Sequence, residues 1–147
     1  MQDVAATEDW PARLRELGRR VTRQRLAVLE ALELRPHATA EEVHADAART
    51  VPGISLQAVY LMLAELSSAG LLRRFDAPRQ PARYETRTGD NHHHLVCEGC
   101  GRVEDVECTL GRSPCLTPSE THGFLVEQAL VTFLGRCPQC ADAAREP

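Results

Sequence analysis

The sequence predicts an α+β fold in two domains, and three observations lead to that prediction. Residues 1–85 contain four short segments with apolar residues at helical spacing, followed by two short β segments. Residues 86–91 are polar and contain Gly89, which is typical of a hinge. Residues 92–147 alternate as short strands do and hold two Cys-x-x-Cys motifs. We therefore expect a helical N-terminal domain, a hinge and a small C-terminal α/β domain. The strands expected in the last domain cover residues 92–97, 102–107 and 127–134, and a helix is expected over 118–123.

Capping residues set the limits of the four predicted helices. Thr22 and Ser55 have the side chains of N-cap residues, and Thr39 with Glu42 three positions later predicts a capping box. Gly70 suits the left-handed position that follows a helix. The predicted helices cover residues 8–17, 22–35, 39–50 and 55–69.

Two short β segments with an arginine-bearing turn follow the fourth helix. Residues 71–76 and 82–85 predict a hairpin. Together with the helices at 39–50 and 55–69, this order describes a winged helix-turn-helix. The last of these helices would enter the major groove of double-stranded DNA, and the hairpin would be the wing. A plain helical domain, with Tyr60 as a core aromatic, is the alternative.

The charges favour DNA contact by the first domain only. The net charge is −4, but residues 1–91 hold 13 of the 17 basic and 13 of the 21 acidic residues, whereas residues 92–147 hold 4 and 8. Every basic residue is an arginine, the better bidentate partner for phosphate. Solvated helix faces would also account for the arginine clusters. The residues expected to contact DNA are Arg19, Arg20, Arg23, Arg25, Ser55, Gln57, Ala58 and Tyr60.

The two Cys-x-x-Cys motifs are separated by 36 residues. Each motif turns so that both sulfurs point to one centre, and two of them supply the four thiolates of a tetrahedral zinc site. Such a closed site joins distant parts of a chain and leaves no position open for catalysis. Two disulfides or buried thiols are the alternative, which the acidic N-terminus without an export signal disfavours. The expected zinc ligands are Cys97, Cys100, Cys137 and Cys140.

Three consecutive histidines predict a second metal site. His92 and His94 are two positions apart in a predicted strand, so their side chains lie on one face and that of His93 on the other. Imidazole binds iron, nickel, zinc or copper, and carboxylates shift the preference toward iron and manganese. A solvated or locally bonded ring is the alternative for each histidine. Further candidate ligands are Glu85, Asp105, the competing Glu107, and His37, which would make a site that spans both domains.

Five motifs between residues 10 and 140 share the pattern of one family. They are Val21-Thr22-x-Gln24-Arg25, His37-Ala38-Thr39-Ala40-Glu41-Glu42, Ser55-x-x-Ala58-Val59-Tyr60, His92-His93-His94-Leu95-Val96-Cys97-x-x-Cys100-Gly101 and Gly135-x-Cys137-x-x-Cys140. With them the chain resembles the ferric-uptake-regulator (Fur) superfamily. Residues 83–94 further resemble its actinobacterial FurA branch, which comprises repressors associated with catalase-peroxidase genes.

The resemblance implies a homodimer that represses by binding an AT-rich inverted repeat when loaded with a divalent metal. It implies structural zinc at the four cysteines and a regulatory site for Fe(II) or Mn(II), with zinc or nickel possible in vitro. The same ligand set occurs in the peroxide-sensing PerR branch, so peroxide would oxidise His37 or His92 and release the DNA. An iron- or nickel-level uptake regulator and a thiol-redox-controlled repressor are the alternatives. The implied regulatory ligands are His37, Glu85, His92, His94 and Asp105.

The sequence departs from the family pattern in the DNA reader and in the C-terminal domain. The family often has threonine at Ala58 and arginine at Leu61, so the operator preference is open. Cys108 and Cys115 lie outside both Cys-x-x-Cys motifs. They are either small residues without a metal, or redox-active thiols or ligands of a third metal site. His93 and His122 are the histidines that such a third site would use.

The remaining expectations concern the class of protein and its location. No His-x-Glu or His-Glu-x-x-His string accompanies the histidines, so a zinc hydrolase or deaminase is disfavoured. A zinc-bound interaction module without DNA binding is a further alternative, which the arginine clusters disfavour. No apolar run approaches the ~20 residues that cross a bilayer. We expect a cytoplasmic regulator that is not an enzyme and does not contact a membrane.

Overall fold

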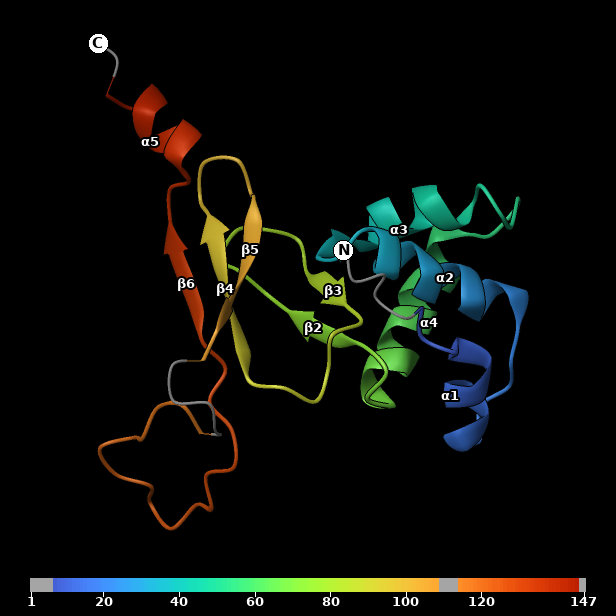
Figure 1. Ribbon diagram of the computed structural model, residues 1–147, viewed down its shortest axis with the longest axis horizontal. Helices are drawn as coiled ribbons and strands as arrows, with labels where there is room; N and C mark the ends of the chain where they lie inside the picture. The colour runs from blue at the N-terminus through green and yellow to red at the C-terminus, as the bar shows by residue number, and fades with distance from the viewer. Residues whose placement is uncertain (1–6, 109–113, 146–147) are drawn as a thin grey trace, which may run out of the picture. The chain divides into compact units, whose positions relative to one another are not determined.

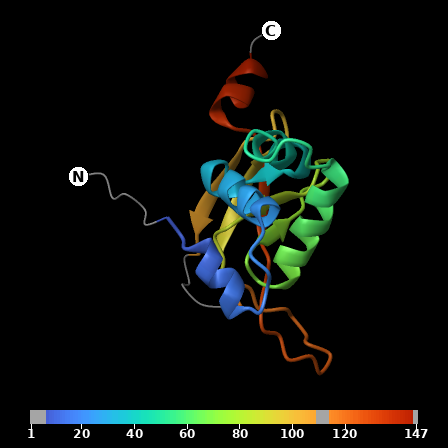
Figure 2. The ribbon, with the colours of Figure 1, turned by 90° about the vertical axis from the view of Figure 1, so that its right-hand side faces the viewer.

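A computed structural model describes residues 7–108 and 114–145 of the chain. Most helices belong to the first half of the sequence and the longer strands to the second, as the colours of Figures 1 and 2 show. The predicted α+β class, with a helical N-terminal region and a C-terminal sheet, is therefore confirmed. No helix in these two ranges is long and apolar enough to cross a membrane.

Internal contacts divide the chain into two units. Unit 1 extends to Asp76 and also includes Pro81–Thr88. Unit 2 comprises Ala77–Gln80 and the chain from Gly89 onward. Each unit has its own sheet, which we call sheet A in unit 1 and sheet B in unit 2. The domain limits expected from the sequence, at residues 85 and 91, remain a prediction.

Four helices build unit 1, and side chains cap their first turns. The Thr22 and Ser55 hydroxyls accept hydrogen bonds from the backbone N–H three residues on, at 3.2 and 3.0 Å. Thr39 and Glu42 form the predicted capping box. Gly70 follows the last helix with φ +77°, as its role after a helix requires. The helices are α1 (Trp10–Glu16), α2 (Arg23–Leu34), α3 (Ala40–Ala47) and α4 (Leu56–Ser68).

The helices of unit 1 pack around an aliphatic core. Leu14, Leu29, Leu32 and Leu63 are completely removed from solvent. Each such side chain contributes about 1.5–3 kcal/mol through burial. Unit 1 therefore has an apolar core of its own, which fixes the positions of the helices that carry its surface residues.

Sheet A has three short antiparallel strands. The predicted hairpin is present as β2 (Arg73–Phe75) and β3 (Arg83–Glu85). The sequence did not predict the third strand, β1 (Ala38–Thr39), which pairs with β3 in the order β1-β3-β2. Two residues are too few for an alternating pattern, so β1 had no periodic signal.

Sheet B has the strand order β5-β4-β6. The central strand β4 (His92–Cys97) pairs antiparallel with β5 (Val103–Glu107) and parallel with β6 (Thr132–Gly135). Helix α5 (Pro138–Ala143) follows and contains the last cysteine of the second motif. The sheet places the two Cys-x-x-Cys motifs at one end, because both β4 and β6 run toward it.

One expectation for unit 2 is only partly confirmed, and a second is wrong. A strand over 127–134 was expected, but β6 begins only at Thr132, where pairing with β4 begins. A helix over 118–123 was also expected, but these residues are irregular. His122 and Gly123 both have positive φ, at 49° and 81°, which a right-handed helix does not accommodate. Helix α5 was missed because it is short and begins within a cysteine motif.

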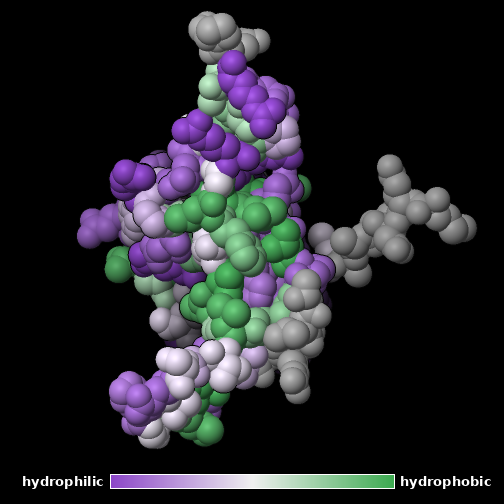
Figure 3. Space-filling model, turned by 90° about the vertical axis from the view of Figure 1, so that its left-hand side faces the viewer, coloured by the Kyte–Doolittle hydropathy of each residue, from purple (hydrophilic) through white to green (hydrophobic). Residues whose placement is uncertain are grey.

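One face of sheet B is apolar and exposed. Leu95 and Phe133 are opposite each other on β4 and β6 and are 44% and 48% exposed. Figure 3 views the molecule from the β6 side and shows a broad apolar area there. In the described part of unit 2, the buried apolar side chains are only Ala77, Val96 and Cys97. So small a core makes metal ligation an important source of stability.

Candidate metal centres

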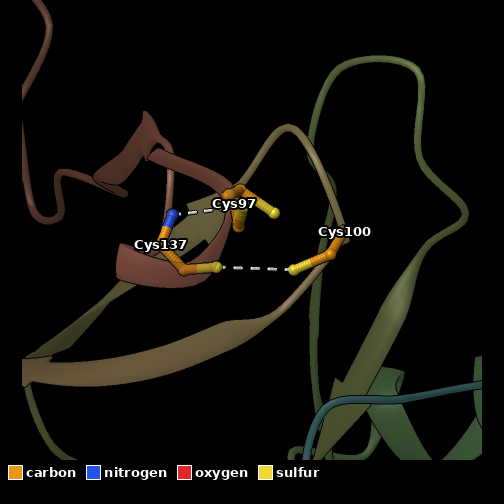
Figure 4. Close-up of side chains that lie close together, drawn as sticks. Cys97, Cys100 and Cys137 are labelled. Carbon is orange, nitrogen blue, oxygen red and sulfur yellow. Dashed lines mark hydrogen bonds between the residues drawn. The ribbon is translucent and has the colours of Figure 1, made fainter. Parts of the chain in front are cut away.

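The four motif cysteines come together at the end of sheet B. Cys97 ends β4, Cys100 lies in the turn after it, Cys137 caps α5 and Cys140 lies within α5. Their sulfur atoms all lie within 4.8 Å of one another. The Sγ atoms of Cys100 and Cys137 are 3.7 Å apart (Figure 4). Sulfurs at about 2.3 Å from a tetrahedral zinc lie about 3.8 Å apart, so this cluster fits the ion.

Backbone groups support the cluster. The Cys137 N–H donates to Cys97 Sγ at 3.3 Å, as Figure 4 shows. Hydrogen bonds from the backbone at Cys137 and Cys100 lower the pKa of Cys97 to about 6, whereas those of the neighbouring sulfurs raise the pKa of Cys140 to about 12. A Cβ on Gly99 would lie 3.0 Å from Cys140 Sγ, so glycine is needed for this close approach. The backbone therefore favours the thiolate form of Cys97, and the chain packs closely beside Cys140.

The opposite end of β4 carries two buried imidazoles on one face. The rings of His92 and His94 have centroids 5.0 Å apart and are both buried. Asp105 Oδ1 lies 3.8 Å from His92 Nε2 and 3.5 Å from His94 Nε2, because β4 and β5 pair His94 with Asp105. Asp90 contacts His92 Nδ1, which orients that ring and leaves Nε2 for a ligand. Glu107, the competing carboxylate, is paired with His92 in the ladder.

Unit 1 has its own histidine–carboxylate pair. His37 Nε2 lies 3.2 Å from Glu85 Oε2, and Glu85 is 1% exposed. Strand β1, which the sequence did not predict, makes this pair possible. Ala38 pairs with Tyr84 in the antiparallel ladder, so His37, which precedes Ala38, lies beside Glu85, which follows Tyr84. His37 has φ +66°, which is rare outside glycine and is typical of functional positions. Sequence reasoning named both residues but found no reason for their proximity.

A second cysteine cluster lies on the other side of β4. His93 Nε2 is 3.0 Å from Cys115 Sγ, and Cys108 Sγ is 2.9 Å from Cys115 Sγ. The ligand atoms of these three residues lie within 4.8 Å of one another. His122, the other histidine considered, is 75% exposed and lies 3.6 Å from Glu120. We name His93, Cys108 and Cys115 the second cluster.

Comparison with known proteins identifies the family. The model of the ferric uptake regulator family matches residues 16–133. This chain belongs to the ferric uptake regulator family. It is 45% identical over 138 residues to the transcriptional regulator FurA of Mycobacterium tuberculosis, covering 94% of each chain.

Solved structures of the family have the same fold. The ferric uptake regulator of Vibrio cholerae matches with a TM-score of 0.66 and 25% identity, over 86% of this chain and 98% of that one. The peroxide stress regulator of Campylobacter jejuni matches with a TM-score of 0.64 and 25% identity, over 88% and 94%. Family membership confirms a metal-responsive transcriptional regulator that is not an enzyme.

In this family member, the start of α4 presents a polar and apolar mixture to solvent. Ser55, Gln57 and Tyr60 are exposed, and Ala58 is partly buried. The Tyr60 hydroxyl donates to Glu41 Oε1 at 2.6 Å, so the ring is held on the surface rather than in the core. That hydrogen bond raises the pKa of Tyr60 and lowers the pKa of Glu41.

The arginines expected to contact DNA differ in their surroundings. Arg19, Arg20 and Arg23 are exposed. Arg25 is more enclosed: its Nη2 lies 2.8 Å from Glu65 Oε1, and its Nη1 donates to the Arg20 carbonyl at 2.8 Å. Arg25 therefore connects α2 to α4, and DNA contact by any of the four stays a prediction.

Proposed function

We propose that this chain is a metal-dependent repressor that senses iron and peroxide and binds an AT-rich inverted repeat as a dimer. The observation that carries the proposal is the buried pair His92 and His94 with Asp105 beside both Nε2 atoms. Buried imidazoles facing a carboxylate are a costly arrangement for a core, but a natural one for a metal site.

The regulatory ligands in this proposal are those implied by the resemblance. Three imidazoles and two carboxylates form a donor set that suits Fe(II) or Mn(II) better than a set of thiolates would. Each half of the set is already ordered, with His37 beside Glu85 and His92 and His94 beside Asp105. The proposed ligands are His37, Glu85, His92, His94 and Asp105.

Peroxide sensing would follow from the Fe(II) form. Fe(II) held by these ligands would supply the electrons that reduce peroxide, and His37 and His92 are the ligand imidazoles proposed to be oxidised in consequence. Loss of one imidazole from a five-ligand set would lower metal affinity and with it the population of the DNA-binding state. Mn(II) would support DNA binding without this chemistry.

The DNA contacts in the proposal lie on unit 1. The start of α4 would read base edges through Ser55, Gln57, Ala58 and Tyr60. Phosphates would be bound by the exposed arginines, with Arg25 also positioning α2 against α4 through Glu65. The resemblance of residues 83–94 to the FurA branch, whose repressors are associated with catalase-peroxidase genes, is the reason to propose such a gene as the target. The DNA-binding set proposed is Arg19, Arg20, Arg23, Arg25, Ser55, Gln57, Ala58 and Tyr60.

The dimer in the proposal forms through the apolar face of sheet B. Exposed apolar areas of this kind mark protein–protein contacts. Phe133→Glu would place a charge on this face and should yield a monomer in sedimentation experiments. If the Phe133→Glu variant still sedimented as a dimer, the dimer interface would have to lie on another surface.

The experiment that tests the function compares metals and peroxide. The zinc-containing chain is bound to its own upstream DNA with no added metal, with Mn(II) and with Fe(II), before and after peroxide. We expect tight binding with either metal, and loss only in the Fe(II) sample with added oxygen on His37 or His92 by mass spectrometry. Loss of DNA binding in every sample, together with oxidised cysteines, would indicate that thiols control the repressor. If peroxide abolished DNA binding in no sample, the protein would respond to the metal concentration and not to peroxide.

A substitution at Asp105 sharpens this test. The resemblance associates aspartate at this position with peroxide sensing and glutamate with iron sensing alone. Asp105→Glu should keep Fe(II)-dependent DNA binding but lose the peroxide response. Glu104→Asp is the matched control, because Glu104 pairs with Arg102 at 2.7 Å and is 56% exposed. Equal peroxide responses of the Asp105→Glu and native chains would contradict the role assigned to Asp105.

A further inference from the structure

The second cluster lies where three segments of unit 2 meet. His93 comes from the centre of sheet B, Cys108 directly follows β5, and Cys115 is 22 residues from His93 along the chain. Asn91 Nδ2 donates to Cys115 Sγ at 2.7 Å, so this sulfur is contacted by an amide, an imidazole and a second sulfur. His93 is 5% exposed, although it lies on the same sheet face as Leu95 and Phe133, which are about half exposed.

We propose that His93, Cys108 and Cys115 bind a thiophilic metal ion, with zinc as the first candidate. Two sulfurs and one imidazole are a soft donor set, which selects zinc or Cu(I) and not manganese or magnesium. The proposal is independent of the regulatory function proposed above, because it shares no ligand with that site.

The donor number distinguishes this site from the four-cysteine site. No fourth histidine, cysteine or carboxylate is grouped with the three in the part of the chain that the structure describes. Three protein ligands and one exchangeable position are the pattern of an accessible zinc, whereas four ligands make a closed one. A cavity of about 600 Å³ beside the three residues, lined also by Val106, Glu107 and Phe133, has room for the fourth ligand.

The ligand geometry requires a small opening of the cluster. The 2.9 Å between the two Sγ atoms is shorter than the about 3.8 Å of a tetrahedral zinc site. Cys108 and Cys115 both lie outside helices and strands, so the sulfurs can separate without breaking a ladder. Asn91 would donate to the bound thiolate, as outer-shell groups do at metal sites.

Cobalt spectroscopy tests the proposal on the full chain. The chain is prepared reduced, with zinc in the four-cysteine site, and titrated with Co(II). The regulatory ligands contain no sulfur, so a thiolate-to-cobalt charge-transfer band reports the second cluster as long as zinc stays in the four-cysteine site, which is checked by measuring zinc content. We expect one such cobalt per chain, displaced by one equivalent of zinc.

Substitutions assign the band to its ligands. Cys108→Ser, Cys115→Ser and His93→Gln should each weaken cobalt binding by more than the about 10–100-fold that an outer-shell partner contributes. His122→Gln is the matched control and should bind cobalt as the native chain does. Zinc content is the folding control: a variant that retains zinc in the four-cysteine site has a folded unit 2.

Three results would overturn the assignment. They are a native chain without the charge-transfer band, a Cys115→Ser variant whose band has native intensity and affinity because cobalt has replaced the first zinc, and a reduced preparation that is two hydrogens lighter because Cys108 and Cys115 form a disulfide.

Discussion

The two cysteine clusters of unit 2 use the same strand but are prepared for metal to different degrees. In the four-cysteine cluster, the Sγ atoms of Cys100 and Cys137 already have a tetrahedral separation, and backbone N–H groups lower the pKa of Cys97 to about 6. In the second cluster the sulfurs are closer than a metal requires, and burial raises the pKa of Cys115. The four-cysteine cluster is preorganised for a metal by the turn after β4 and the start of α5. In the second cluster, the side chains must move apart before a metal can bind.

The largest expected difference between the clusters concerns stability. Cys137→Ser should abolish zinc binding at the first cluster and, with it, the cooperative unfolding of unit 2. Binding energy at a structural zinc site is folding energy, about 10–16 kcal/mol in zinc-finger peptides. Zinc content and thermal unfolding measure the effect. Cys115→Ser is the control and should keep zinc at the four-cysteine cluster and the cooperative unfolding transition of unit 2. If both variants lost zinc and the transition equally, the two clusters would not differ in their contribution to stability.

The next difference concerns the order of metal loss. A strong chelator should remove metal from the second cluster before the first, because three ligands and an open position exchange faster than four closed ones. The time course of zinc release, monitored by the absorbance of a chelator that changes colour on binding zinc, should show two phases in the native chain. Cys108→Ser should show one slow phase. A single phase in both proteins would mean that the second cluster holds no metal.

The same contrast explains what the sequence could predict. The Cys-x-x-Cys spacing is local, so Cys97, Cys100, Cys137 and Cys140 could be assigned from the order of residues alone, as could the alternation of His92 and His94. The three helix starts at Thr22, Thr39 and Ser55 were equally local.

Proximity between distant residues could not be read in this way. The His37–Glu85 pair depends on the two-residue strand β1, which has no periodic signal. The second cluster joins residues 22 positions apart, so the sequence could only leave the role of Cys108 and Cys115 open. Contacts made by tertiary packing have no pattern in neighbouring residues.

A smaller effect is expected at Gly99, beside the first cluster. Gly99→Ala should destabilise zinc-bound unit 2 by about 1–3 kcal/mol, the usual cost of overpacking, because its Cβ would lie 3.0 Å from Cys140 Sγ. Thermal unfolding of the zinc-bound protein measures this. Gly135→Ala is the matched control, since its Cβ would meet nothing within 4 Å. Equal stabilities of the two variants would mean that the four sulfurs are not tightly enclosed.

The smallest effect is expected at Asn91, beside the second cluster. Asn91→Ala removes the donor to Cys115 Sγ but no ligand, so cobalt affinity should fall about tenfold, at the low end for an outer-shell partner. The intensity of the charge-transfer band at saturation should not change, because both sulfurs still bind. The first zinc serves as the internal control. An unchanged affinity would mean that the amide stabilises only the metal-free thiol, and a lost band would make Asn91 essential to the site's structure.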